Sequence, residues 1–122
     1  QLTAFFGSHT EPDEPVFMFP EQGALSFIID RPFVGRFPMV SFSWIGDSWH
    51  DELLNDLKKA SPEFVILPQV PDATFEKVYF KIRQNKDRYD EILNYIMANY
   101  ILVGTTHSFY IYRIKGNQMG NP

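Results

Sequence analysis

The residues best suited to acid–base or metal chemistry are three histidines. His9, His50 and His107 lie far apart in the chain, and none belongs to a motif with the spacing of metal ligands. We expect each of them to lie at the surface or to cap a helix. The chain has no cysteine, which excludes a thiol nucleophile, a zinc–thiolate site and a disulfide. The sequence therefore predicts neither a metal site nor a bound cofactor.

The hydroxyl and carboxyl side chains do not indicate a catalytic site either. No serine lies in a Gly-x-Ser-x-Gly turn, and neither common glycine-rich phosphate loop occurs. Most acidic residues fall on expected helices, where a solvated face explains them: Asp51, Glu52, Asp56, Asp87, Asp90 and Glu91. We expect no catalytic residue in this chain. An independent small hydrolase, with carboxylates or histidines converging in one cleft, is an alternative.

The turn at residues 19–24 is the place where the local sequence suggests a ligand site. It joins the carboxyl end of an expected strand to the start of an expected helix, where ligands bind in open α/β sheets and helix amides can hold an anion. Nearby arginines could add hydrogen-bond donors, and a tryptophan could stack on a sugar. The predicted binding residues are Glu21, Gln22, Gly23, Arg31, Arg36 and Trp44. The simpler interpretation is a proline–glycine turn that only makes the corner.

Two elements must position this turn. Residues 16–19 form a short apolar run between two prolines, which predicts a buried strand. Residues 21–29 predict a short helix that ends before Arg31, because a residue that precedes proline avoids the helical region. We expect residues 33–44 to be extended and to contain one or two short strands.

A longer helix and a second strand follow. Asp47 and Ser48 are expected to cap a helix that carries leucines at positions 53, 54 and 57 on one face and ends at Ser61. Residues 64–67 have apolar side chains at four successive positions. This pattern predicts a strand that is buried on both faces of a sheet.

The last part of the chain predicts helices and then a hairpin. After a loop at residues 68–72, apolar residues at 75, 78, 79 and 82 fit a helix, although alternation through 78, 80 and 82 would fit a strand. Residues 84–88 are polar and are expected to form a loop tip, and residues 90–100 predict a helix. Residues 101–106 and 109–114 are extended and two residues apart, which indicates a hairpin. Residues 116–122 are expected to be a frayed polar tail.

This order of elements predicts a single α/β domain over residues 1–122, with a core at 14–114 and an N-terminal lead-in at 1–10. The sheet is expected to be mixed, with a parallel centre, helices packed on its faces and the antiparallel C-terminal hairpin at its edge. The 12 Phe and 6 Tyr residues are typical of a core built from rings. A net charge of −4 without a basic stripe argues against nucleic-acid binding. No run reaches the roughly 18 apolar residues that a membrane span needs.

Several stretches, taken in order, resemble a known family. Residues 14–21 read EPVFMFPE, residues 27–32 read FIIDRP and residues 36–38 read RFP. This pattern is similar to the soluble C-terminal α/β domain of GT-C class membrane glycosyltransferases, such as dolichyl-phosphate-mannose-protein mannosyltransferases and aminoarabinose transferases. The leucine-rich helix followed by SPEFVIL at 61–67, and NYILV at 99–103 with YIYR at 110–113, resemble later parts of the same domain. Asp30 is a departure, because a glycine is usual before Arg-Pro.

The resemblance implies a noncatalytic domain. In such transferases the catalytic acid and the lipid-phosphate-sugar site belong to the membrane-embedded part and its first external loop. On this resemblance we expect a C-terminal domain from a longer protein, with residues 1–6 leading from the last span, on the extracytoplasmic (periplasmic or extracellular) face of the membrane. It would pack on the membrane-embedded remainder of the same polypeptide or assist binding of a carbohydrate or lipid-linked sugar. The alternative is a freestanding small-molecule or carbohydrate-binding module.

Overall fold

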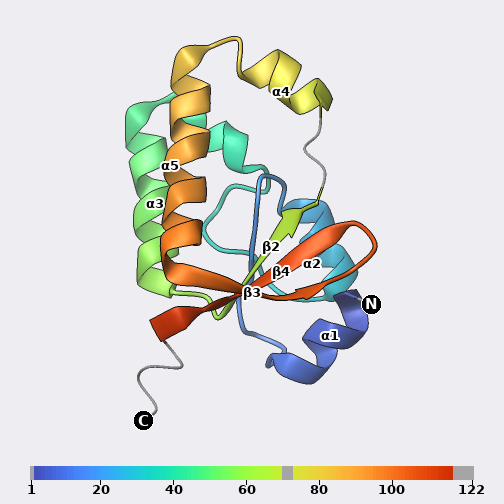
Figure 1. The fold of residues 1–122 in the computed structure, drawn as a ribbon. Helices are drawn as coiled ribbons and strands as arrows, with labels where there is room; N and C mark the ends of the chain where they lie inside the picture. Colours follow the sequence, from blue (N-terminus) through green and yellow to red (C-terminus); the bar gives the residue numbers. More distant parts are fainter. Residues whose placement is uncertain (1, 70–72, 117–122) are drawn as a thin grey trace.

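Strand β2 (Phe64–Pro68) lies inside a four-stranded sheet and organises the fold. In this computed structural model, which describes residues 2–69 and 73–116, the strand order is β1-β2-β4-β3. Strand β1 (Phe17–Met18) runs parallel to β2, whereas β4 (Phe109–Ile114) and β3 (Tyr100–Thr105) form an antiparallel hairpin that joins the other side of β2. The fold is therefore α/β with a mixed sheet and a C-terminal hairpin at its edge, as predicted (Figure 1).

The side chains of β2 alternate between two apolar cores, which confirms that this strand is buried on both faces. Phe64 and Ile66 pack with helices α1 (Leu2–His9) and α2 (Gly23–Ile29) in what we call the α1–α2 core. Val65 and Leu67 pack with helices α3 (Asp47–Ala60) and α5 (Arg83–Asn99) in the α3–α5 core. Figure 1 shows α3 and α5 side by side, away from α1 and α2.

The first helix extends the core beyond its expected limit. Residues 1–10 were expected to be a lead-in outside the core, but Leu2 and Phe6 of α1 are buried beside Phe64. Thr3 Oγ1 also donates a hydrogen bond to the carbonyl oxygen of Ile28, 3.2 Å away. The apolar core therefore begins well before residue 14. No helix in the described part of the chain is long and apolar enough to cross a membrane.

Helix α3 confirms the predicted helix at its C-terminal end but not at its start. Its three leucines are buried, and Ser61 ends it in the left-handed conformation with φ 41°. The expected cap by Asp47 and Ser48 is wrong, because Gly46 occupies the N-cap position and no side chain caps the helix. Asp47 instead forms an ion pair with Arg88 of α5.

The expected strands in residues 33–44 are largely wrong. Phe33 and Met39 each make a single β-bridge, and the chain then forms the 3₁₀ helix η1 (Val40–Ile45). On a strand, Phe42 and Trp44 would share one face. In the structure Phe42 is 44% exposed and Trp44 only 4%, so the two rings point in different directions.

Between β2 and β3 the described residues form two helices, and the boundary between these helices differs from the predicted one. The helical alternative is confirmed for α4 (Ala73–Tyr79), although the helix stops before Ile82. Residues 84–88 were expected to form a loop tip, but they belong to α5. This exposed turn has no apolar stripe, and an i,i+4 ion pair of 2.7 Å between Lys86 and Asp90 supports it instead. Residues 70–72 of the expected loop and 117–122 of the expected tail lie outside the described residues.

Candidate functional site

The side chain of Gln22, predicted to bind a ligand, is fully buried and bonded to the backbone. Its amide nitrogen donates to the carbonyl oxygens of Val34 and Phe37, at 2.9 and 3.0 Å. Its Oε1 accepts a longer hydrogen bond of 3.4 Å from the amide of Met18. Gln22 therefore ties β1, the start of α2 and the loop after it into one unit.

The backbone amides at this corner are also bonded within the chain. The amides of Gln22 and Gly23 both donate to the carbonyl oxygen of Pro38, at 2.8 and 2.9 Å. The amide of Ala24 donates to Glu21 Oε2, 3.2 Å away. The groups that were predicted to hold an anion already have partners, so this geometry favours the simpler interpretation, a turn that makes the corner.

Arg31 connects the end of α2 to the end of α1. Its Nε donates to Thr10 Oγ1 at 2.8 Å, and its Nη2 donates to the carbonyl oxygens of Phe6 and Thr10 at 3.1 and 3.2 Å. The preceding residue, Asp30, ends α2 with φ 56° and ψ 48°, in the left-handed region. Glycine takes this conformation most easily, and Asp is among the few other residues that tolerate it.

Arg36 lies on the surface near the first turns of α3. Its Nε and Nη2 donate to the two carboxylate oxygens of Glu52, at 2.7 and 3.2 Å. This hydrogen-bonded pair raises the pKa of Arg36 and lowers the pKa of Glu52 from their ordinary values. The guanidinium carbon also lies 4.6 Å from the ring centre of Phe37 and 5.3 Å from that of Trp49. Arg36 is thus already paired and stacked on side chains of this chain.

Trp44 is buried in the α3–α5 core, where its ring packs near those of Phe75, Tyr79 and Tyr89. Trp44 also lines a hollow together with Ile45 and Ile82. Arg31 lines a different hollow, beside Phe27. The structure therefore brings Glu21, Gln22 and Gly23 together but does not join Arg31, Arg36 and Trp44 to them in one pocket.

The three histidines occupy three different environments. The prediction of a surface or capping position is wrong for His50, which is only 4% exposed and lies between α3 and α5. Its Nε2 lies 2.8 Å from Glu91 Oε1. His107 is exposed in the turn between β3 and β4. His9, the last residue of α1, is exposed and lines a hollow that sequence reasoning missed.

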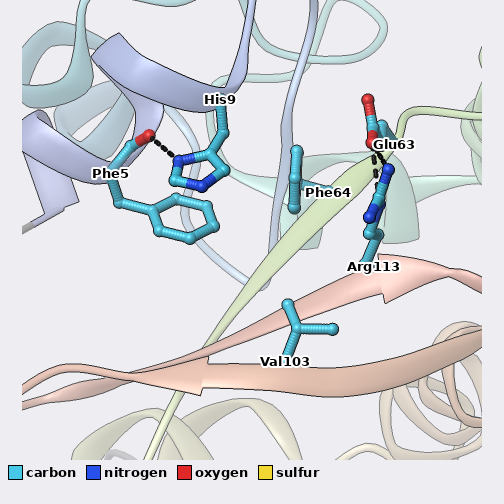
Figure 2. A pocket seen from close by; sticks show the side chains of 6 residues that line it. All are labelled: Phe5, His9, Glu63, Phe64, Val103 and Arg113. Atoms are coloured by element: carbon cyan, nitrogen blue, oxygen red, sulfur yellow. Dashed lines mark hydrogen bonds and ion pairs between the residues drawn. The ribbon is translucent and has the colours of Figure 1, made fainter.

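This hollow, which we call the His9 hollow, lies between α1 and the sheet and has a volume of about 260 Å³ (Figure 2). Its lining residues come from α1, from the start of β2 and from both strands of the hairpin. They are Phe5, His9, Glu63, Phe64, Val103 and Arg113. In Figure 2 the His9 ring lies on one side, the Glu63–Arg113 pair lies on the other, and Phe64 and Val103 lie between them.

The His9 ring is held in a fixed orientation. Its Nδ1 lies 2.8 Å from the carbonyl oxygen of Phe5, and a carbonyl oxygen can only accept a hydrogen bond. Nδ1 therefore carries a hydrogen, and in the neutral ring Nε2 is left as an acceptor. The ring also stacks on Phe5 with centroids 4.1 Å apart, and Phe5 packs edge-on against Phe64.

An ion pair forms the opposite wall of the hollow. Arg113 Nε and Nη2 both contact Glu63 Oε2, at 2.8 and 2.7 Å. Neither contact involves Arg113 Nη1, and Glu63 Oε1 points away from the guanidinium (Figure 2). The guanidinium carbon lies 5.9 Å from the ring centre of Phe64. The wall is neutral overall and carries both donors and an acceptor.

A partial signal for this site was present in the sequence. The antiparallel pairing places Phe64 opposite Arg113, so Glu63 and Arg113 become neighbours once β4 is known to pair with β2. Sequence periodicity predicted both strands but could not say that they are partners. It also gave no sign that α1 folds back over them.

Comparison with protein-family models, with curated proteins and with solved structures finds no match for this chain. Within residues 2–69 and 73–116, the structure contains no group of three or more His, Cys, Asp or Glu side chains that could hold a metal ion.

Proposed function

We propose that this domain is a noncatalytic extramembrane part of a membrane-embedded glycosyltransferase that uses a lipid-linked sugar donor. The observation that carries the proposal is the backbone at Asp30. The family pattern usually has glycine there, and Asp30 adopts the left-handed conformation that glycine takes most easily. Asp30 therefore departs from the pattern in residue type but keeps the backbone conformation that glycine favours at this position.

The other residues of the pattern support the same proposal because they build the framework around α2. Residues 17–19 form β1 and the turn after it, Arg31 fastens α1, and the carbonyl oxygen of Pro38 accepts the two amides at the start of α2.

Exposed apolar side chains support a packing role on the remainder of the polypeptide. Phe27 and Ile28 are neighbours on α2 and are 88% and 54% exposed. Exposed apolar side chains that lie near one another are a feature of interaction surfaces. We propose that the domain packs on the catalytic loops of the membrane-embedded remainder, or assists acceptor binding, on the extracytoplasmic face.

The complete coding sequence tests this proposal. We expect several membrane spans upstream of Gln1, and we expect a cysteine placed at exposed Asn94 of the full-length protein to react with a membrane-impermeant maleimide added from outside the cell. A reading frame without upstream spans would overturn the proposal. Labelling that requires permeabilised cells would overturn the extracytoplasmic location.

A second candidate function is a freestanding carbohydrate-binding module, and the His9 hollow is the observation that favours it. This function does not require upstream spans. The complete coding sequence therefore separates the two candidates, because only the transferase proposal predicts a membrane-embedded part.

A further inference from the structure

We propose that the His9 hollow binds a neutral, polyhydroxylated ring, which is the chemistry of a single sugar unit. It gives the second candidate function its ligand class and rests on the same hollow, which lies outside the turn at residues 19–24. It does not depend on the proposed transferase role. Three features of the hollow support it: a fixed acceptor, a neutral polar wall and an apolar surface between them.

The fixed acceptor is His9 Nε2. The hydrogen bond from Nδ1 to the Phe5 carbonyl and the stacking on Phe5 set both the tautomer and the ring orientation. A ligand hydroxyl can donate to Nε2 without first ordering the side chain, which reduces the entropic cost of binding.

The neutral polar wall selects against charged ligands. An anion that approached Arg113 would meet the Glu63 carboxylate, and a cation that approached Glu63 would meet the guanidinium. A hydroxyl group can donate and accept, so it can pair with both members of the wall. Neighbouring hydroxyls on one ring are therefore the groups that this wall fits best.

The apolar surface fits the remaining part of such a ring. Phe64 and Val103 lie between the two polar sides, and a sugar ring presents C–H groups between its hydroxyls. A wholly apolar ligand would take water from His9 Nε2, Arg113 Nη1 and Glu63 Oε1 without giving them a hydrogen-bond partner, which is costly. A volume of about 260 Å³ is below the usual range for drug-sized ligands, so it fits one ring rather than a chain.

NMR titration of the 122-residue chain tests the inference with methyl α-D-glucopyranoside and methyl α-D-mannopyranoside as probes. We expect saturable shifts of the His9 ring signals and the Val103 methyl signals, with contacts between sugar protons and the Val103 methyls in filtered NOE spectra. Sodium acetate and ethylammonium chloride serve as the anionic and cationic comparisons, and both should bind more weakly. The inference is overturned if neither glycoside produces saturable shifts at these residues, or if either ion binds more tightly.

Matched variants test the role of His9. His9→Phe keeps an aromatic ring on Phe5 but removes Nε2, and we expect the affinity for the glycosides to fall about tenfold or more. His107→Phe makes the same change in the β3–β4 turn and should leave the affinity unchanged. Equal affinity in His9→Phe and the unaltered chain would contradict the inference.

Glu63→Gln tests the neutral wall. The variant keeps the shape of the side chain but leaves the Arg113 charge unpaired, so the preference should move from glycoside to acetate. If a variant does not fold, the NOE contacts of the unaltered chain still decide the outcome. Failure of these titrations would not bear on upstream membrane spans, and absence of spans would not bear on the titrations.

Discussion

His50 Nε2 of α3 lies 2.8 Å from Glu91 Oε1 of α5, and this contact joins the two helices of the α3–α5 core. The imidazole is buried, whereas the Glu91 side chain is 57% exposed. An ionised carboxylate only accepts, so Nε2 carries a hydrogen, and in the neutral ring Nδ1 holds a lone pair. The structure gives this buried Nδ1 no hydrogen-bond partner.

Glu91→Ala should therefore destabilise the protein, because it leaves a buried imidazole N–H without an acceptor. We expect a loss of about 1–3 kcal/mol in the free energy of unfolding, measured by urea denaturation at neutral pH. Glu91→Gln keeps an acceptor oxygen and should lose less. Asn94→Ala, at an exposed position on the same helix, is the control, and an equal loss there would show that the His50 contact contributes nothing.

Gln22→Met should be among the more damaging single changes in the chain. The side chain keeps a similar length, but the carbonyl oxygens of Val34 and Phe37 lose their donor in a buried site. We expect a loss of about 1–3 kcal/mol for each carbonyl that stays unpaired, measured by urea denaturation. Gln84→Met, on the exposed start of α5, should change stability little. A small effect at Gln22 would mean that water replaces the amide.

Arg31→Lys should loosen α1 without unfolding the molecule. A lysine ammonium cannot reproduce the planar fork that reaches Thr10 Oγ1 and three carbonyl oxygens at once. Hydrogen exchange of the α1 amides should therefore become faster, while exchange in β2 stays slow. Arg83→Lys, at the exposed start of α5, is the matched control. Unchanged exchange in α1 would show that the Arg31 hydrogen bonds do not hold the helix in place.

Tyr100 should make the protein less stable in alkaline solution. Burial raises the pKa of Tyr100 above its ordinary value of 10.0, and the hydroxyl donates to the carbonyl oxygen of Pro62. Above pH 10 the unfolded chain loses this proton before the folded chain does, so stability falls as pH rises. Burial raises the pKa of Tyr89, Tyr95 and Tyr112 in the same direction.

Urea denaturation at a series of pH values between about 9 and 11 measures this effect. Tyr100→Phe should have a shallower decline in the free energy of unfolding over that range, even though it is less stable at neutral pH. Met97→Ala, exposed on α5 and without a titratable group, should keep the original slope. An equal slope in Tyr100→Phe would show that this hydroxyl does not contribute to the pH dependence.

The sequence predicted those elements whose apolar residues are dense and regular. Strand β2 and helix α3 are examples, since four successive apolar residues and a leucine stripe each allow one arrangement. The start of α5 has no such stripe. The local ion pair between Lys86 and Asp90 supports it, and its polar residues are also typical of a loop. Residues 40–44 were expected to be extended because Phe42 and Trp44 are two positions apart, which is the period of a strand, whereas residues 40–45 form a 3₁₀ helix.

The predicted binding residues show a different limit of prediction from sequence. Glutamine and arginine beside a turn can bind a ligand or can bond to carbonyl oxygens of the chain itself, and residue type does not distinguish these partners. In the structure Gln22 and Arg31 both donate to carbonyl oxygens of the chain itself. The His9 hollow was missed for the opposite reason, because its parts become neighbours only when α1 folds back beside the β2–β4 pair.

The alternation of the β2 side chains between the two cores also affects how the protein unfolds. Phe64 and Ile66 belong to one core while Val65 and Leu67 belong to the other, so both cores share a single backbone segment. When that segment leaves the sheet, each core loses two buried side chains at once. Helix α1 and helix α5, on opposite faces, should therefore melt together in one cooperative transition rather than as independent halves.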